Sequence, residues 1–318
     1  MKNSRSFKGA CARCLAVCAS VALMAAAAVS CGNNNTNEEV SQDDGLAAFF
    51  NGNVQAVDSI KASLDEGQSL FADEKNLYVV DRYGVVQRVN PQLNKVYLVF
   101  TAHFSTDDNG RFENFDGIVP VLDVLKEKGV KGSFFPTGNC FREEKYQEPI
   151  KRIIEEGHYL SAHSNHHLLL CAYENRDSTL VSADSIATDI AGMEAELNKF
   201  GLEKSQYSWM IPPYEYYNQE TADALRNLGY SLVNPTRGIE TGMDWMGKDH
   251  PEYMSAEEQI ASIWTYEQEK TLNGCVVLVH AMVYPDREDA DRIFTHLGEI
   301  IDRMRELGYE FGTFSELI

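Results

Sequence analysis

The chain has 318 residues and a net charge of −20 at neutral pH, because 48 Asp and Glu outnumber 28 Lys and Arg. This excess of acidic side chains argues against nucleic acid and other strongly anionic polymers as electrostatic ligands. Beyond residue 31 the cysteines are scattered rather than paired at metal-like spacings. Neither a disulfide framework nor a cysteine-ligated zinc site is therefore expected.

Residues 1–30 predict an export signal rather than a part of the fold. Four basic residues precede an apolar, Ala-rich stretch, which ends in small residues followed at once by Cys31. This order resembles a bacterial lipoprotein signal in which Cys31 becomes the acylated first residue. A plain secretory signal is the alternative, and the apolar run is too short for a membrane span. We expect an exported lipoprotein, anchored to the membrane of a bacterial cell envelope on its periplasmic side or at the cell surface.

Three further regions follow the signal. Residues 31–44 are polar and of low complexity, as is typical of a tether between a lipid and a folded domain. Residues 45–94 predict a short N-terminal extension, with an amphipathic stretch over 45–64 and a hairpin that turns at Arg82-Tyr83-Gly84. Residues 95–318 remain, and this length suits one domain. Loss of residues 1–30 removes four basic and no acidic residues, so the mature chain carries −24.

From residue 95 onward, short apolar runs alternate with segments of helical periodicity. Apolar residues recur at intervals of three and four over 186–197 and over 293–307, which predicts two of the helices. The alternation predicts an α/β fold with parallel strands, and runs that are apolar on both faces favour a closed or nearly closed barrel. The predicted strands are 96–101, 132–137, 159–163, 207–211, 231–235, 275–280 and 309–314.

Reactive residue types follow five of these seven strands. In barrels of this kind the chemistry occurs at the carboxyl ends of the strands, while the opposite ends here carry Lys, Glu and Gly. The sequence therefore predicts an active site at one end of the barrel. The residues concerned are His103, Asp107 and Asp108, then His163 and His167, then Tyr214 and Glu215, then Arg237, and finally His280.

His163 and His167 predict half of a metal site. They are four residues apart, so both imidazoles reach one ion if the strand runs into a helical turn. Two histidines and one carboxylate with an open position form a hydrolytic site, where the ion activates water and polarises a carbonyl.

Other strand ends offer the remaining groups of such a reaction. Asp107 and Asp108 supply a metal ligand and a proton acceptor, and His280 supplies a proton donor for the departing group. A backbone N–H near Tyr214 is placed to stabilise an oxyanion. The chain contains no Gly-rich phosphate loop, no G-x-S-x-G nucleophile elbow and no helical H-E-x-x-H.

The segment from 95 to 318 resembles the polysaccharide deacetylase family, also called the NodB-homology domain. GHYLSAHSNHH at 157–167 is similar to the family's G-H-E-[IL]-x-x-H-[ST]-x-x-H, and GVKGSFFPTGN at 129–139 to the signature that ends in F-F-x-x-G. Three shorter matches to the third, fourth and fifth motifs are Pro212-Pro213-Tyr214, Asp244-Trp245 and the run 277–280.

This resemblance implies a distorted (β/α)7-type barrel with a short N-terminal extension. It implies a metal-dependent hydrolase that removes acetyl groups from a polysaccharide or oligosaccharide, with the acetyl group on nitrogen or on oxygen. The implied cofactor is a divalent metal ion, zinc. The implied roles are metal ligands at Asp108, His163 and His167, general base at Asp107, general acid at His280 and oxyanion donor at Tyr214.

The first motif departs from the family's pattern. The family has T-F-D-D directly at the end of the first strand, whereas this strand ends at His103 and the aspartates come a few residues later. Either the strand bulges, with Asp107 as base and Asp108 as ligand, or His103 enters the metal shell. We favour the aspartates.

The third motif also departs. The family has Arg before Pro-Pro-Tyr to steady the base and to pair with the position of Asp244, but this chain has the apolar Ile211. Either Arg237 substitutes for that arginine from the fifth strand, or Glu215 reorganises the site. The departures leave one alternative function, a catalytically inactive glycan-binding lipoprotein on the same barrel.

Overall fold

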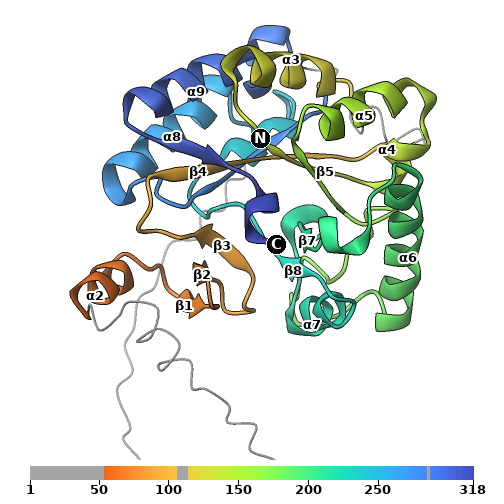
Figure 1. The fold of residues 1–318 in the computed structure, drawn as a ribbon, viewed down its shortest axis with the longest axis horizontal. Coiled ribbons are helices and arrows are strands. Elements are labelled where there is room, and N and C mark those ends of the chain that lie inside the picture. Colours follow the sequence, from red (N-terminus) through yellow and green to blue (C-terminus); the bar gives the residue numbers. More distant parts are fainter. Residues whose placement is uncertain (1–53, 106–113, 285–286) are drawn as a thin grey trace, which may run out of the picture. The chain divides into compact units, whose positions relative to one another are not determined.

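The structure is a computed structural model that describes residues 54–105, 114–284 and 287–318, and helices and strands alternate along most of it (Figure 1). The strands are β1 (Ser69–Ala72), β2 (Leu77–Val80), β3 (Val86–Val89), β4 (Lys95–Ala102), β5 (Ser133–Pro136), β6 (Tyr159–Leu160), β7 (Trp209–Met210), β8 (Ser231–Leu232), β9 (Val276–His280) and β10 (Glu310–Gly312). The helices are α2 (Val54–Ala62), α3 (Ile118–Lys128), α4 (Gly138–Arg142), α5 (Gln147–Glu155), α6 (Ala183–Lys199), α7 (Gln219–Asn227), α8 (Ala256–Lys270) and α9 (Leu297–Glu306). No helix among these residues is long and apolar enough to cross a membrane.

Parallel strands form the centre of the fold. β4 pairs in parallel with β5, β9 and β10, and β5 pairs in parallel with β6. β7 and β8 form a second parallel pair, which a bridge between Ala162 and Met210 joins to the end of β6. All seven predicted strands beyond residue 95 are present, and the predicted α/β fold with parallel strands is confirmed.

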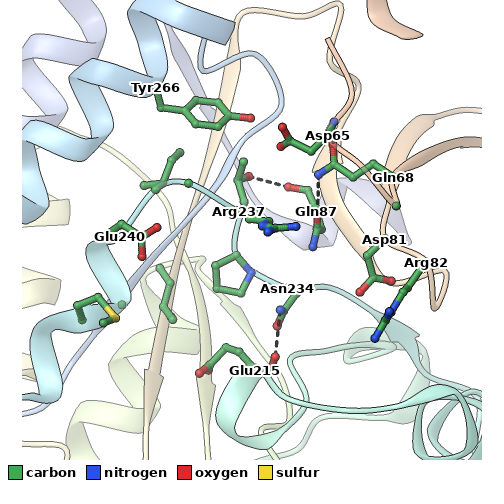
Figure 2. Close-up of a pocket in the computed structure, with 18 of the residues that line it drawn as sticks. Asp65, Gln68, Asp81, Arg82, Gln87, Glu215, Asn234, Arg237, Glu240 and Tyr266 are labelled. Carbon is green, nitrogen blue, oxygen red and sulfur yellow. Dashed lines mark hydrogen bonds between the residues drawn. The ribbon is translucent and has the colours of Figure 1, made fainter. Parts of the chain in front are cut away.

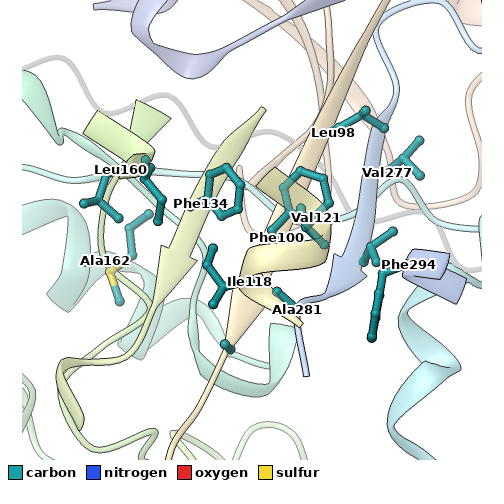
Figure 3. Close-up of a cluster of buried hydrophobic side chains, with 14 of the residues drawn as sticks. Leu98, Phe100, Ile118, Val121, Phe134, Leu160, Ala162, Val277, Ala281 and Phe294 are labelled. Carbon is teal, nitrogen blue, oxygen red and sulfur yellow. The ribbon is translucent and has the colours of Figure 1, made fainter. Parts of the chain in front are cut away.

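The two faces of the central strands pack into two different clusters. Leu98, Phe100 and Phe134 face the helices and contact buried residues of α3 and of the C-terminal region (Figure 3). The alternate residues Tyr97 and Val99 belong to a second buried cluster. This alternation explains why the strands are apolar on both faces, since successive side chains of a strand point to opposite sides.

The N-terminal hairpin completes the second cluster. β1, β2 and β3 form an antiparallel sheet, and Tyr78 and Val86 of this sheet pack in the same cluster as Val99. β3 forms one bridge to Val233 after β8 and another from Arg88 to Cys275 before β9. The hairpin therefore lies against the barrel strands where β8 and β9 have no direct pairing with each other.

Polar contacts hold the hairpin in this position. The Arg88 guanidinium donates to the Asn273 carbonyl at 2.9 and 2.7 Å. The Tyr217 hydroxyl donates to Asp81 at 2.8 Å, next to the predicted turn, and the Thr236 hydroxyl donates to the Gln87 carbonyl at 2.6 Å. The hairpin is thus fixed along both of its sides, and not only through apolar packing.

Candidate active site

The loop after β6 carries the two histidines predicted as metal ligands. The helical turn that the spacing of four residues would require after the strand is absent, because residues 163–167 form an irregular turn. Ser164 and His167 have positive φ values of 68° and 55°, and the His167 N–H donates to the Ser164 hydroxyl at 3.0 Å. The turn nevertheless places Nε2 of His167 only 3.2 Å from Nε2 of His163.

Both imidazoles are neutral. Burial lowers the pKa of His163 to about 3, and burial also lowers the pKa of His167 well below its ordinary value. Nδ1 of His163 lies 2.8 Å from the Ile211 carbonyl, so this nitrogen carries the proton and Nε2 keeps a lone pair. Ile211 itself is fully buried, and its backbone orients His163 although its side chain does not replace the family's arginine.

The second imidazole also presents a lone pair. The Tyr214 N–H donates to Nε2 of His167 at 3.3 Å, which requires an unprotonated nitrogen there. At 3.2 Å the two Nε2 atoms are close enough to share a proton or to bind one cation together. Two nitrogen ligands of a tetrahedral zinc ion are roughly 3.3 Å apart, given zinc–nitrogen distances of about 2.0–2.1 Å. The histidine pair therefore fits a divalent metal ion.

The third ligand is not defined by the described residues. Among them, no three His, Cys, Asp or Glu side chains form a group that could hold a metal ion. His103 lies beside the pair: its ring stacks on His167 with centroids 4.6 Å apart, and its Nδ1 lies 3.0 Å from the Thr137 hydroxyl. Asp107 and Asp108 belong to residues 106–113, outside the described part of the chain. Both alternatives of the sequence analysis remain predictions.

His280 at the end of β9 is paired with Asp244 of the short helix Thr241–Trp245. One Asp244 oxygen accepts a hydrogen bond from Nδ1 of His280, and the other accepts the His280 backbone N–H at 2.9 Å. Burial by itself lowers the pKa of His280, but the Asp244 carboxylate outweighs it and raises this pKa to about 9. His280 is therefore protonated at neutral pH, the state a general acid needs. Asp244, whose family partner is replaced by Ile211, has this histidine as its partner instead.

The segment after β7 contributes Tyr214 and Glu215 through a strained turn. Both have positive φ values, 60° and 51°, and the Tyr214 ring stacks on His167 with centroids 4.1 Å apart. Oε1 of Glu215 is buried without a hydrogen-bond partner and lies 3.7 Å from Nε2 of His163. Burial raises the pKa of this carboxyl to about 7. Glu215 was predicted at this end of the barrel, but its position next to a predicted metal ligand was not.

Asn165 and Asp189 hold the histidine loop in place, and two glycines leave room for the Asn165 side chain. The Asn165 side chain lies against Gly138 and Gly192, so closely that a Cβ atom at either glycine would collide with it. The Asp189 carboxylate accepts the backbone N–H groups of Asn165 and His166 at 2.8 and 3.1 Å. Asn165 and Asp189 thereby fix the loop that positions both imidazoles.

Replacing Gly192 by alanine is expected to displace Asn165 and to weaken metal binding about 10- to 100-fold, the usual effect of disturbing groups that orient ligands. Titration of the metal-free protein with zinc measures this change. Gly298→Ala is the matched control, because the added methyl group there meets the flexible end of Lys128 and makes an ordinary contact with Val124. Unchanged zinc affinity in Gly192→Ala would show that Asn165 does not orient the ligands.

A cavity of about 1140 Å³ adjoins this site (Figure 2). Its wall includes Tyr214 and Glu215 from the site, Arg237 from the segment after β8, and residues of the N-terminal hairpin. Arg237 is exposed and makes no hydrogen bond or ion pair with the described residues, and its substitution for the family's arginine stays a prediction. Of the aromatic residues near the site, Tyr214 and Trp245 are 40% and 38% exposed, whereas Tyr217 is buried.

Comparison with protein families gives one match and several relatives. The family model described as "Polysaccharide deacetylase" matches residues 104–233. The peptidoglycan-N-acetylmuramic acid deacetylase PdaA of Bacillus subtilis is 26% identical over 243 residues, which cover 76% of this chain and 77% of PdaA. A peptidoglycan-N-acetylglucosamine deacetylase of Bacillus cereus is 24% identical over 198 residues, 62% of this chain and 80% of that protein.

Solved structures confirm the fold. PdaA of Bacillus subtilis, described as a family 4 carbohydrate esterase, superposes with a TM-score of 0.52 at 21% identity. The superposition covers 80% of this chain and 96% of the PdaA chain. A family 4 pseudoenzyme from Bacillus anthracis superposes with a TM-score of 0.55 at 15% identity. This superposition covers 82% of this chain and 93% of the pseudoenzyme chain. At these identities the similarity concerns the fold, and an active and an inactive protein can share it.

Proposed function

We propose that this chain, whose family match and relatives support a polysaccharide deacetylase domain, removes acetyl groups from a glycan in a metal-dependent hydrolysis. The observation that carries the proposal is the convergence of two neutral imidazole nitrogens at 3.2 Å, at the end of the barrel that also carries a protonated histidine. Both relatives are named for N-acetylated sugars of peptidoglycan, so an N-acetylated glycan is the first substrate to test.

The metal ion, which we propose to be zinc, would polarise the acetyl carbonyl and lower the pKa of a bound water molecule. His163 and His167 would hold it, together with Asp108 or, in the alternative, His103. Their neutral state favours metal binding, because no proton has to leave either imidazole.

The chain's own groups would move the protons and stabilise the developing charge. Asp107 accepts the proton of the attacking water in this proposal, and His280 donates a proton to the departing sugar nitrogen. Asp244 keeps His280 protonated until that step. The Tyr214 N–H would donate to the oxyanion, and its contact with Nε2 of His167 supports this role.

Acetate release tests the proposal. Purified protein with added zinc is incubated with N-acetylated chito-oligosaccharides, with peptidoglycan fragments and with acetylated xylan, each with and without a chelator. We expect release from at least one substrate that chelation abolishes. Binding of glycan without any acetate release would support the alternative of an inactive glycan-binding protein.

We also propose that the protein is exported and anchored by a lipid on Cys31. The support is the order of basic, apolar and small residues that precedes this cysteine. Metabolic labelling with a radioactive fatty acid should mark the protein, and Cys31→Ser should lose the label. Export with a signal cleaved elsewhere, and no label, would favour the plain secretory signal.

A further inference from the structure

The cavity beside the site is built from two parts of the chain that are distant in sequence. One wall comes from the barrel segments after β7 and β8, and the other from the N-terminal hairpin, including Asp81, Arg82 and Gln87 (Figure 2). Its volume of about 1140 Å³ exceeds the roughly 300–1,000 Å³ of a pocket for a drug-sized ligand. A single acetylated sugar does not fill a space of this size.

We propose that this cavity is a glycan subsite, which binds the sugar units next to the one that is deacetylated and whose outer wall is the hairpin. The inference rests on the proposed function, because Tyr214 and Glu215 belong both to the active site and to the cavity. A glycan chain with one acetyl group at the histidine pair can therefore continue into the cavity.

Unused hydrogen-bond donors lie in both walls. Arg237 has no partner among the described residues, and Gln87 accepts a hydrogen bond from Gln68 at 2.6 Å while its own Nε2 donates to none of them. The other three cationic side chains of the cavity already have partners: Lys270 pairs with Asp65, Arg176 donates to the Tyr217 carbonyl at 2.6 Å, and Arg82 donates to the Tyr83 hydroxyl. Arg237 and Gln87 are thus the donors available to sugar hydroxyl groups.

The charge of the cavity favours a neutral glycan. Six acidic side chains line it against four basic ones. Carboxylates accept hydrogen bonds from hydroxyl groups but repel a carboxylate on a ligand. The class of ligand is therefore a neutral oligosaccharide that extends beyond the reacting sugar.

The hairpin wall is pre-organised for this role. Tyr217 and Thr236 bond to it from the barrel, and Arg88 bonds from it to Asn273, so little of the wall has to become ordered on binding. Binding to a wall that is already fixed avoids the entropy cost of ordering a loop.

Calorimetry on the chelator-treated protein tests the inference without turnover. The probes are N-acetylated chitobiose, chitotetraose and a carboxymethylated chitotetraose. We expect the neutral tetramer to bind at least about tenfold more tightly than the dimer, which corresponds to one or two added hydrogen bonds. Gln87→Leu and Arg237→Ala should each lose most of this gain, and Arg303→Ala, an exposed arginine on α9 outside the cavity, should keep it.

The outcomes separate this inference from the proposed function. Equal affinity for dimer and tetramer, tetramer binding that neither variant weakens, or preference for the carboxymethylated probe would overturn the glycan subsite as described. Length-dependent binding by a protein that releases no acetate from any glycan would instead overturn the proposed function and leave the subsite in place.

Discussion

Replacing His163 by alanine is expected to remove the bound metal ion and to reduce acetate release at least about a thousandfold, since the ion supplies both the activated water and the polarised carbonyl. Nε2 of His163 is one of two lone pairs that converge at 3.2 Å, and one imidazole cannot hold the ion with comparable affinity. Metal content per chain and acetate release, both measured after adding zinc, check this result.

The same experiment identifies the third ligand. Asp108→Ala is measured beside His163→Ala, with His296→Ala as the control, because His296 is a partly exposed histidine that contacts the Ala290 carbonyl. Loss of metal from both Asp108→Ala and His163→Ala would make Asp108 the third ligand, and loss from His163→Ala alone would assign His103. An unaltered chain that binds no zinc would contradict the metal site and favour the inactive glycan-binding protein.

Replacing Asp244 by asparagine is expected to lower acetate release at pH 7.5 by roughly 10²- to 10⁴-fold, the usual contribution of a general acid. Burial opposes the charge on His280, and Asp244 is what raises the pKa of this histidine to about 9. Without that carboxylate, burial should bring the pKa below the ordinary 6.5 of histidine.

The pH profile shows whether Asp244 acts through His280. A general acid must be protonated, so the activity of the unaltered protein should fall as the pH rises through about 9. In Asp244→Asn the same fall with rising pH should occur at a pH lower than 6.5. Partial recovery of the variant at low pH would not arise from a purely structural defect. Asp302→Asn, at a half-exposed aspartate on α9, is the control. An unshifted profile in Asp244→Asn would contradict the role of His280 as the acid.

Much of the fold could be predicted from local patterns. The period of apolar residues distinguishes strands from helices, so the seven strands beyond residue 95 followed from the sequence. Strands that are apolar on both faces require cover on both sides, which is typical of parallel sheets, so their parallel pairing followed as well. The role of the hairpin did not follow. Its contacts with Val233 and Cys275 join segments about 150 and 190 residues apart, and no local pattern reports such pairings.

The candidate site divides in the same way. His163, His167 and His280 are recognisable from residue type and position at strand ends, and the motif spacing brings them to one end of the barrel. The bond between Asp244 and His280 was not predictable, because the sequence analysis had assigned Asp244 to an arginine that this chain lacks. Glu215 was underestimated for a similar reason, since only burial beside His163 gives its carboxyl a chemical role.

By itself, then, the sequence determined the alternation of strands and helices, the end of the barrel that carries reactive groups and the identity of the two converging histidines, since periodicity and spacing are local properties of a chain. The tertiary structure alone decided the protonation states, the partner of Asp244 and the cavity between hairpin and barrel. Those features depend on burial and on contacts between distant segments, and both arise only when the chain is folded.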